Sequence, residues 1–311
     1  MKLVGLMPIR NEEWVVGLSL RAAMLFMDEM VVLDHASSDG TPELLAAIAA
    51  EHPGRIHLLS EPDEVWHEAA IRQRLLDAGR EAGATHLCAL DADEVLTGNL
   101  LPSIRTMFAA LAPGEGLWLP WLAMWRSLEL SRQDASPLVG EAGSMVLGFH
   151  DAPHLHYAAW SGEYDIHCRH PRGMGEERRL ATARSGGGMF HLAFVNWPRL
   201  QAKTAWYKMV ERLRFPWRRT AAALNAWYAC DLDETGLETA AVDPGWWAPY
   251  ARWRDAVKLD AGDACDSWYA QECRRLWAEH GPAPFSGLDL WGVPEGRDDE
   301  RQAAPLQGLP R

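Results

Sequence analysis

His86-Leu87-Cys88-Ala89-Leu90-Asp91-Ala92-Asp93-Glu94 is the stretch of sequence that decides the fold. Its first five residues predict a buried strand, which runs directly into three carboxylates. Because side chains alternate along an extended chain, Asp91 and Asp93 share one side and aim at one place beyond the strand. Clustered carboxylates repel one another unless a cation lies between them, and Mg²⁺ or Mn²⁺ accepts oxygen ligands. The alternative is that these residues are solvated turn formers, since a bare DxD is common by chance.

The chain before this stretch alternates between apolar strands and amphipathic helices. Strands are predicted at residues 2–7, 30–33, 55–60 and 86–90. Apolar residues at helical spacing predict one helix after each of the first three strands. Such alternation predicts a mainly parallel sheet covered on both faces, with ligands at the carboxyl ends of the strands.

The pattern changes in the second half of the chain. From about Leu117, apolar and aromatic runs are separated by loops rich in Gly, Pro and His, which predicts the later, partly antiparallel half of the same domain. Helical periodicity returns from Pro198 to about Cys230 and from Cys265 to His280. We therefore predict a first domain over residues 1–197 and a mainly helical extension over residues 198–311.

Composition narrows the class of protein. The 43 Asp and Glu residues outnumber the 30 Lys and Arg residues, so the field of the chain repels a phosphate backbone and argues against a nucleic-acid partner. Five cysteines without a CxxC pair argue against a disulfide framework and favour a reducing cytoplasm. The apolar N-terminus is too short for a signal peptide, and no stretch approaches the roughly 18 apolar residues of a membrane span. We expect a soluble protein without a membrane span.

Three linked motifs resemble those of the family 2 nucleotide-sugar glycosyltransferases, which have the GT-A fold. They are PIRNEE at residues 8–13, LDHASSDGT at residues 33–41 and LDADE at residues 90–94, and the resemblance covers residues 1 to about 100. It implies an α/β fold with a mixed, mainly parallel sheet flanked by helices. It also implies transfer of a sugar from a nucleoside-diphosphate donor, with a lean toward UDP and inversion, and a divalent cation, Mg²⁺ or Mn²⁺, as cofactor.

The resemblance also places the donor. Pro8 and Arg10 fall where the family contacts the nucleoside, and we count Glu12 of the same loop among the donor-binding residues. Asp34 and Asp39 match the acidic residues of the second loop, and Asp39 resembles the one that hydrogen-bonds the base. The alternatives are a simple turn at Asp39 and a turn or helix cap at Asp34.

For the diphosphate and the metal, the resemblance indicates residues of the third helix and of LDADE. Arg72 lies near the arginine that faces the diphosphate in the family, with Arg74 as the competing choice and a solvated helix arginine as the alternative. Asp93 resembles the direct metal ligand. Asp91 resembles the residue that contacts the ribose or holds a metal-bound water, so we place it among both the donor and the metal residues.

Half of the 12 histidines lie between residues 150 and 191, which raises the possibility of a zinc hydrolase. No HExxH or comparable spacing appears, so we set zinc catalysis aside. His191 lies in an apolar strand, MFHLAF, at a position similar to a late histidine that serves many GT-A enzymes as a metal ligand. The alternative is a satisfied histidine in the core.

An inverting transferase needs a general base to deprotonate the acceptor hydroxyl, usually a carboxylate. The acidic pair of the family is not evident after the metal motif, and here the sequence departs from the pattern. Glu163 and Asp165 in WSGEYDIH are the candidates, and ordinary loop acids are the alternative.

Two rival functions remain from the sequence. A sugar-phosphate nucleotidyltransferase would begin with a glycine-rich loop bearing Arg and Lys, which PIRNEE is not. A degenerate, carbohydrate-binding relative is suggested by the 16 tryptophans and the missing base. The acceptor, whether glycan, small molecule, lipid or peptide, has no readable motif, and the Trp-rich helices are candidates for a homodimer interface.

Overall fold

A computed structural model describes residues 1–62, 65–134, 143–158, 168–175, 179–229, 233–257 and 267–296. Its strands are β1 (Leu3–Ile9), β2 (Glu29–His35), β3 (Ile56–Glu61), β4 (His86–Ala89), β5 (Glu94–Leu96), β6 (Gly116–Ala123), β7 (Leu130–Arg132), β8 (Ser144–His150), β9 (Arg179–Leu180), β10 (Met189–His191) and β11 (Thr239–Ala241). Its α-helices are α1 (Val16–Ala23), α2 (Thr41–Glu51), α3 (Glu68–Glu81), α4 (Leu101–Ala109), α5 (Trp197–Arg214), α6 (Ala221–Ala229), α7 (Ala251–Arg254) and α8 (Trp268–His280).

Two compact units make up the chain. The first comprises Met1–Leu192 and Glu238–Leu259, and the second comprises Ala193–Leu237 and Asp260–Arg311. The segment from Glu238 belongs to the first unit, whereas the predicted boundary places it in the extension. Its aromatic side chains account for this, because the Tyr250 hydroxyl donates to the Leu96 carbonyl at 2.7 Å and Trp247 stacks on Phe190.

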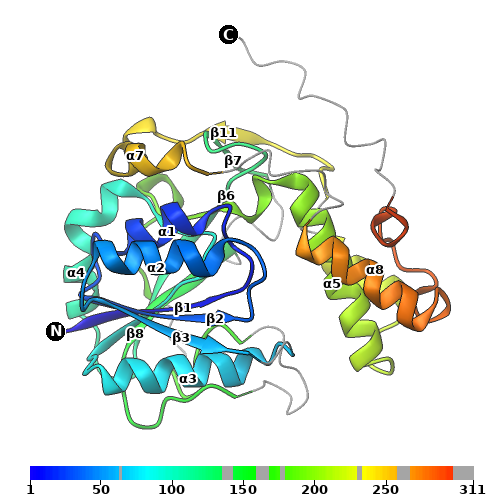
Figure 1. The fold of residues 1–311 in the computed structure, drawn as a ribbon. Coiled ribbons are helices and arrows are strands. Elements are labelled where there is room, and N and C mark those ends of the chain that lie inside the picture. The colour runs from blue at the N-terminus through cyan, green and yellow to red at the C-terminus, as the bar shows by residue number, and fades with distance from the viewer. Residues whose placement is uncertain are drawn as a thin grey trace. The chain divides into compact units, whose positions relative to one another are not determined.

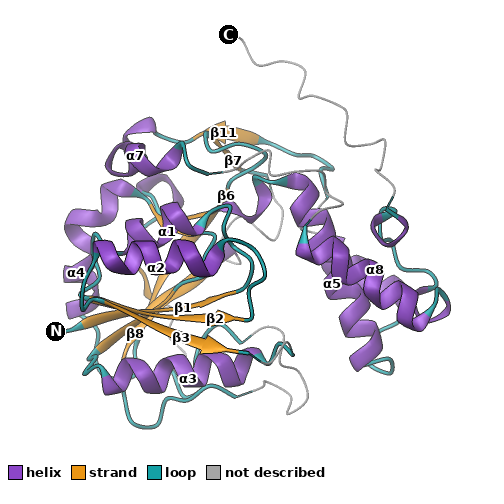
Figure 2. Cartoon of the chain, viewed as in Figure 1, coloured by secondary structure: helices purple, strands orange, loops and turns teal. Residues whose placement is uncertain are grey.

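The first unit is built on one large mixed sheet with the strand order β3-β2-β1-β4-β8-β6-β10-β5, and β9 pairs with β6. Strands β1 to β4 are mutually parallel, β8 runs antiparallel to β4 and to β6, and β10 is parallel to β6. Figure 2 shows the strands as one layer between helices. The fold-class prediction, a mixed and mainly parallel α/β sheet flanked by helices, is confirmed.

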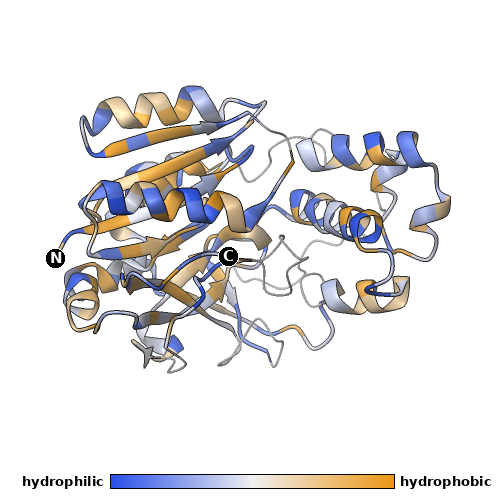
Figure 3. Cartoon of the chain, turned by 90° about the horizontal axis from the view of Figure 1, so that it is seen from below, coloured by the Kyte–Doolittle hydropathy of each residue, from blue (hydrophilic) through white to orange (hydrophobic). Residues whose placement is uncertain are grey.

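Strand β1, inside the sheet, is buried along its whole length, which explains why it is almost continuously apolar (Figure 3). Along β1, Leu3 and Met7 pack with α1 and α2 on one face, whereas Val4 and Leu6 pack with α3 on the other. Figure 1 shows α1 and α2 on one side of the sheet and α3 on the opposite side. The alternation of side chains along a strand therefore fills two cores from one sequence.

The topology gathers several strand ends at one edge of the sheet, which we call the carboxyl edge. Strands β1, β2, β3 and β4 end there because they are parallel. Two antiparallel steps, β4 to β8 and β8 to β6, bring β6 back into the same direction, and β10 follows it. His191, at the end of β10, therefore lies at the same edge as Asp91, just after β4.

The second unit packs α5 against α8. Asn196 caps α5 by accepting from the Arg199 amide, and Ser267 caps α8 by accepting from the Ala270 amide. Lys208 is buried, and its ammonium donates to the Asp289 carbonyl at 2.9 Å. Among the described residues, no helix combines the length and the apolar character needed to cross a membrane.

Candidate active site

The three carboxylates of the turn between β4 and β5, those of Asp91, Asp93 and Glu94, differ in their exposure to water. The Asp91 amide donates to Glu94 at 3.0 Å, and the Glu94 amide donates to the Asp91 carbonyl at 3.2 Å. These bonds fold Glu94 inward, where its side chain is fully buried. Asp93 is also buried, whereas the Asp91 side chain is 35% exposed. Of the three, Asp91 therefore offers most surface to a ligand.

Five charged side chains form a buried network behind this turn. Arg72 donates to Glu68 and to Asp91, both at 2.7 Å. Arg169 donates to the other Asp91 oxygen at 2.8 Å and to Glu94 at 2.7 Å. Each arginine thus joins two carboxylates, and Asp91 is the residue shared by both. The network fixes the Asp91 carboxylate in place, because each of its oxygens accepts from a different guanidinium.

Burial sets the ionisation of this network. It raises the pKa of Glu94 to about 7, an effect to which Asp91 adds and which Arg169 opposes. Burial also opposes ionisation of Arg169, but Glu94 and Asp91 outweigh it and raise the pKa of this arginine. Burial likewise opposes ionisation of Arg72, but Asp91 and Glu68 outweigh this effect and raise the pKa of Arg72. Both arginines therefore stay charged, and Glu94 is the member that can take up a proton near neutral pH.

Asp93 and His191, the two residues that the resemblance offers as metal ligands, lie near one another at the carboxyl edge. The distance from Asp93 Oδ2 to His191 Nε2 is 3.9 Å. The Leu192 amide donates to the Asp93 carbonyl at 2.8 Å, which ties the two segments together. The His191 imidazole stacks on Trp121 with ring centroids 3.7 Å apart and planes 11° apart. Both side chains are therefore held by rigid surroundings.

This pair fits a divalent cation that also binds a diphosphate. Mg²⁺ in nucleotide sites is usually held by one or two protein ligands, with phosphate oxygens and water completing its shell. Two ligands at right angles and about 2.1 Å from an ion lie about 3 Å apart, so a modest closing of the Asp93–His191 pair suffices. Within the described ranges, no group of three or more His, Cys, Asp or Glu side chains could hold an ion by itself.

The loops after β1 and β2 are joined through Asn11. This residue has a positive φ of 55°, which asparagine tolerates better than most residues. Its side-chain oxygen accepts from the amides of Ser38 and Asp39 at 2.7 and 3.3 Å, and its own amide donates to Ser37. The two loops that the sequence assigns to the donor thus form one hydrogen-bonded structure at the carboxyl edge.

Arg10, just after β1, and His35, the last residue of β2, face one another, with Arg10 Nη1 and His35 Nδ1 3.1 Å apart. Burial and the charge of Arg10 lower the pKa of His35, so this imidazole is neutral at pH 7. Its edge-on contact with Trp66 has a centroid distance of 5.1 Å. Asp34 precedes His35, and its Oδ1 is buried with no hydrogen-bond partner in the described part of the chain. The contacts of Arg10, His35 and Trp66 therefore join the end of β1, the end of β2 and the segment before α3.

Other predicted donor residues serve the fold in this structure. Asp39 accepts from the Thr41 and Glu13 amides, and so ties the turn before α2 to the loop after β1. Glu12 is buried and accepts from the Trp14 indole at 2.7 Å. Pro8 is buried inside β1. These contacts position the loops, and donor binding by these residues stays a prediction.

The two arginine candidates of α3 lie in different surroundings. Arg72 belongs to the buried network at the carboxyl edge. Arg74 is 44% exposed and pairs with Glu61 and the Ser60 carbonyl at the end of β3. The candidates for the general base, Glu163 and Asp165, lie outside the described residues.

Sequence reasoning missed Arg169 and Trp121. Arg169 lies in CRHPRG, which matches no motif we recognise, and Trp121 is one of 16 tryptophans. The signal for Arg169 was indirect: three adjacent carboxylates at the end of a buried strand require positive partners from elsewhere in the chain. Trp121 becomes visible only when β6 and β10 are paired, because Trp121 then lies next to His191 in space.

Comparison with known proteins gave matches among solved structures. One is S. aureus TarS in complex with UDP, with 16% identity and a TM-score of 0.34 over 40% of this chain and 36% of that one. Another is the mannosyltransferase PcManGT from Pyrobaculum calidifontis with GDP-Man and Mn²⁺, with 25% identity and a TM-score of 0.32 over 39% and 35%. A 1–349 form of TarS matches over 95% and 88%, with 11% identity and a TM-score of 0.41.

Two of these structures hold a nucleotide ligand, UDP in one and GDP-Man in the other. The match spans about a third of the length of the first two chains. No family model matches the chain, and no curated protein does so either. With TM-scores of 0.32 to 0.41, these similarities carry no argument about the activity of this chain.

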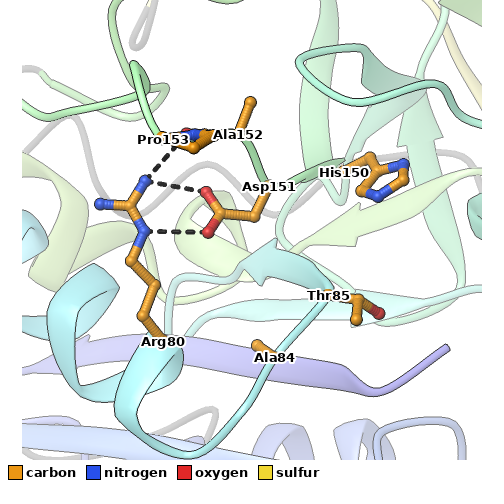
Figure 4. A pocket seen from close by; sticks show the side chains of 7 residues that line it. All are labelled: Arg80, Ala84, Thr85, His150, Asp151, Ala152 and Pro153. Carbon is orange, nitrogen blue, oxygen red and sulfur yellow. Dashed lines mark hydrogen bonds and ion pairs between the residues drawn. The ribbon is translucent and has the colours of Figure 1, made fainter.

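A pocket elsewhere on the first unit lies near the start of β4 and contains none of the predicted site residues (Figure 4). Its lining residues are Arg80, Ala84, Thr85, His150, Asp151, Ala152 and Pro153. The Arg80 guanidinium clamps both oxygens of Asp151 at 2.9 Å and also donates to two backbone carbonyls. Its charged groups are therefore occupied in holding the loop after β8.

His86 stacks on His150 beside this pocket, with ring centroids 4.2 Å apart. The burial of His86 predicts that the protein loses stability in acid. Burial, together with the charges of His150 and the N-terminus, lowers the pKa of His86 to about 4. The folded protein then binds fewer protons than the unfolded chain between about pH 6.5 and 4, so stability is lost as the pH falls through this window. Allowing for solvent screening, we expect a loss of about 1–2 kcal/mol from this group.

The variant His86→Gln should therefore lose less stability than the wild type between pH 7 and pH 4.5, measured as the free energy of unfolding in urea. His154→Gln is the matched control, because His154 is an exposed histidine of the same unit whose Nε2 lies 3.1 Å from the Gly173 carbonyl oxygen, and this variant should keep the wild-type pH dependence. An unchanged pH dependence in His86→Gln would show that His86 is not the group responsible.

Proposed function

We propose that this chain is a metal-dependent glycosyltransferase that moves a sugar from a nucleoside-diphosphate donor to an acceptor hydroxyl. The observation that carries the proposal is the meeting of Asp93 and His191, from segments about a hundred residues apart in sequence, 3.9 Å apart at the carboxyl edge. The Arg10–His35 pair lies in the loops at the same edge. A metal pair and a nucleoside loop at one sheet edge are what a nucleotide-sugar donor needs.

The roles of the chain's own residues follow from their contacts. Asp93 and His191 would hold Mg²⁺ or Mn²⁺, which neutralises the charge that develops on the departing diphosphate. Asp91, fixed by Arg72 and Arg169, is oriented toward the donor without rotational freedom. Such pre-placed groups need no reorganisation when the bond to the sugar breaks, and this favours the transition state over the bound donor.

The finer parts of the proposal rest on the resemblance in the first hundred residues. They are a UDP-linked donor, inversion at the anomeric carbon, and Glu163 or Asp165 as the base that takes the proton of the acceptor hydroxyl. The buried free thiols of Cys88, Cys168 and Cys273 favour a reducing compartment, so we place the protein in the cytoplasm.

Calorimetric titration tests donor binding directly. We expect UDP to bind in the presence of Mn²⁺ and to bind at least tenfold more weakly in the presence of a chelator, because the ion links the phosphates to Asp93. Hydrolysis of UDP-sugars and GDP-sugars, followed as released nucleoside diphosphate, then tests for turnover.

Each outcome of these two measurements has a distinct meaning. Binding that depends on the metal, together with release of the diphosphate, supports the proposal. Binding without turnover of any donor would favour a degenerate, carbohydrate-binding protein. Absence of nucleotide binding with and without Mn²⁺ would overturn the proposed donor site.

A further inference from the structure

The outer surface of α6 is apolar, which is unusual for an exposed helix. Its sequence is AAALNAWYA, and its inward residues are Leu224 and Tyr228. Its exposed residues are Ala222, Ala223, Ala226, Trp227 and Ala229. A helix that is apolar all round is normally buried on every side, so this outer face lacks the polar side chains that suit water.

Two indoles extend this apolar face. Trp217 is 73% exposed and Trp227 is 54% exposed, the highest values for large apolar side chains among the described residues. The Arg219 guanidinium lies over the Trp227 ring, 4.4 Å from its centroid, which places the α5–α6 connection against α6. Ala223 shares a helix face with Trp227, four residues on. We call Trp217, Arg218, Arg219, Ala223 and Trp227 the Trp217–Trp227 surface.

Positive charge surrounds these indoles in a chain that is otherwise acidic. Residues 211–220 contain four arginines and one glutamate, whereas the whole chain has a net charge of −13. The glutamate, Glu211, is buried, pairs with Arg219 and accepts from the Tyr228 hydroxyl. Arg218 is exposed, and Arg212 and Arg214 are half-buried. With four arginines against one glutamate, the net charge of this segment is positive.

We propose that the Trp217–Trp227 surface binds a membrane surface that carries anionic headgroups. Indoles favour the headgroup level of a bilayer, where the ring is apolar and its N–H remains hydrated. Arginines beside them are attracted by the negative potential of anionic lipids. This binding is peripheral, and it is independent of the function proposed above.

A second copy of the chain is a weaker candidate for the occupant. A two-fold contact through this surface brings each copy's Arg218 toward the same surface of the other copy, so that like charges oppose one another. Anionic headgroups instead carry the charge opposite to that of the arginines, and the same headgroup layer accommodates the indoles.

Vesicle sedimentation tests the proposal with the full chain. We expect at least tenfold tighter binding to vesicles of phosphatidylcholine mixed equally with phosphatidylglycerol than to phosphatidylcholine alone, and weaker binding at high salt. Trp217→Ser with Trp227→Ser should lower binding to the mixed vesicles at least tenfold. Arg218→Glu should remove the preference for the anionic lipid.

Arg275→Ala is the matched control, because Arg275 is an exposed arginine of the same unit that pairs with Glu272 and Glu279. It should bind vesicles like the wild type. Circular dichroism and urea unfolding verify that each variant is folded, and Arg218→Glu keeps the test decisive if the double variant is not.

Equal or absent binding of the wild type to the two kinds of vesicle overturns the proposal. So does a double variant that binds the mixed vesicles like the wild type. If the double variant lost a dimer that the wild type forms in sedimentation velocity, but bound vesicles like the wild type, the surface would be assigned to a second copy instead.

Discussion

Asp93→Asn should reduce the rate of sugar transfer by a factor on the order of a thousand, since pre-placed charge at the departing group is often the largest catalytic contribution. Asparagine has nearly the shape of aspartate but carries no charge, so it weakens one of the two ligands that face the ion. The backbone bond between the Asp93 carbonyl and the Leu192 amide is unaffected by this change. We therefore expect a folded protein that binds Mn²⁺ at least tenfold more weakly, measured by electron paramagnetic resonance in the presence of UDP.

Asp77→Asn provides the comparison, because Asp77 is a 56% exposed carboxylate on α3 that belongs to no part of the site. It should leave both transfer and Mn²⁺ affinity at wild-type values. Transfer at a near-normal rate in Asp93→Asn would remove Asp93 from the mechanism. A large loss of transfer with unchanged Mn²⁺ affinity would mean that Asp93 acts on the donor rather than on the ion.

The fold could be predicted from the sequence because its signals are local. The first four strands and the helices between them follow from apolar runs and helical spacing, and all appear close to the predicted bounds. The placement of Glu238–Leu259 could not be predicted in this way. It depends on contacts of Trp247 and Tyr250 with residues more than a hundred positions earlier in the chain.

The residues of the candidate site likewise fall into two groups, those found from local motifs and those found only from long-range contacts. The carboxylates of LDADE and the two donor loops are read from short motifs, and the approach of His191 to Asp93 agrees with the expectation from the resemblance. What no motif conveys is how buried charges are balanced. Arg169 reaches Asp91 and Glu94 across more than seventy positions, and it also donates to the carbonyls of Ala89 in β4 and Val146 in β8.

Arg169→Met should lower the free energy of unfolding by about 3–5 kcal/mol, the usual cost of removing one partner from a buried ion pair. Methionine fills much of the same space but leaves the fully buried Glu94 without its cation. As a matched control, Arg105→Met removes an arginine that is 40% exposed and pairs with Asp28, and it should cost less than about 1 kcal/mol.

The pH dependence of this variant identifies the cause of the loss. Glu94 has a folded pKa of about 7, above its unfolded value, so the stability that it contributes is present at low pH and is lost as the pH rises through 7. Without Arg169, which opposes this shift, the folded pKa rises further, and Arg169→Met should lose more stability than the wild type between pH 6 and pH 8. Adding Glu94→Gln should remove this extra pH dependence and restore part of the stability, because no buried carboxylate is then left unpaired. A double variant as pH-sensitive as Arg169→Met would assign the loss to Asp91 rather than to Glu94.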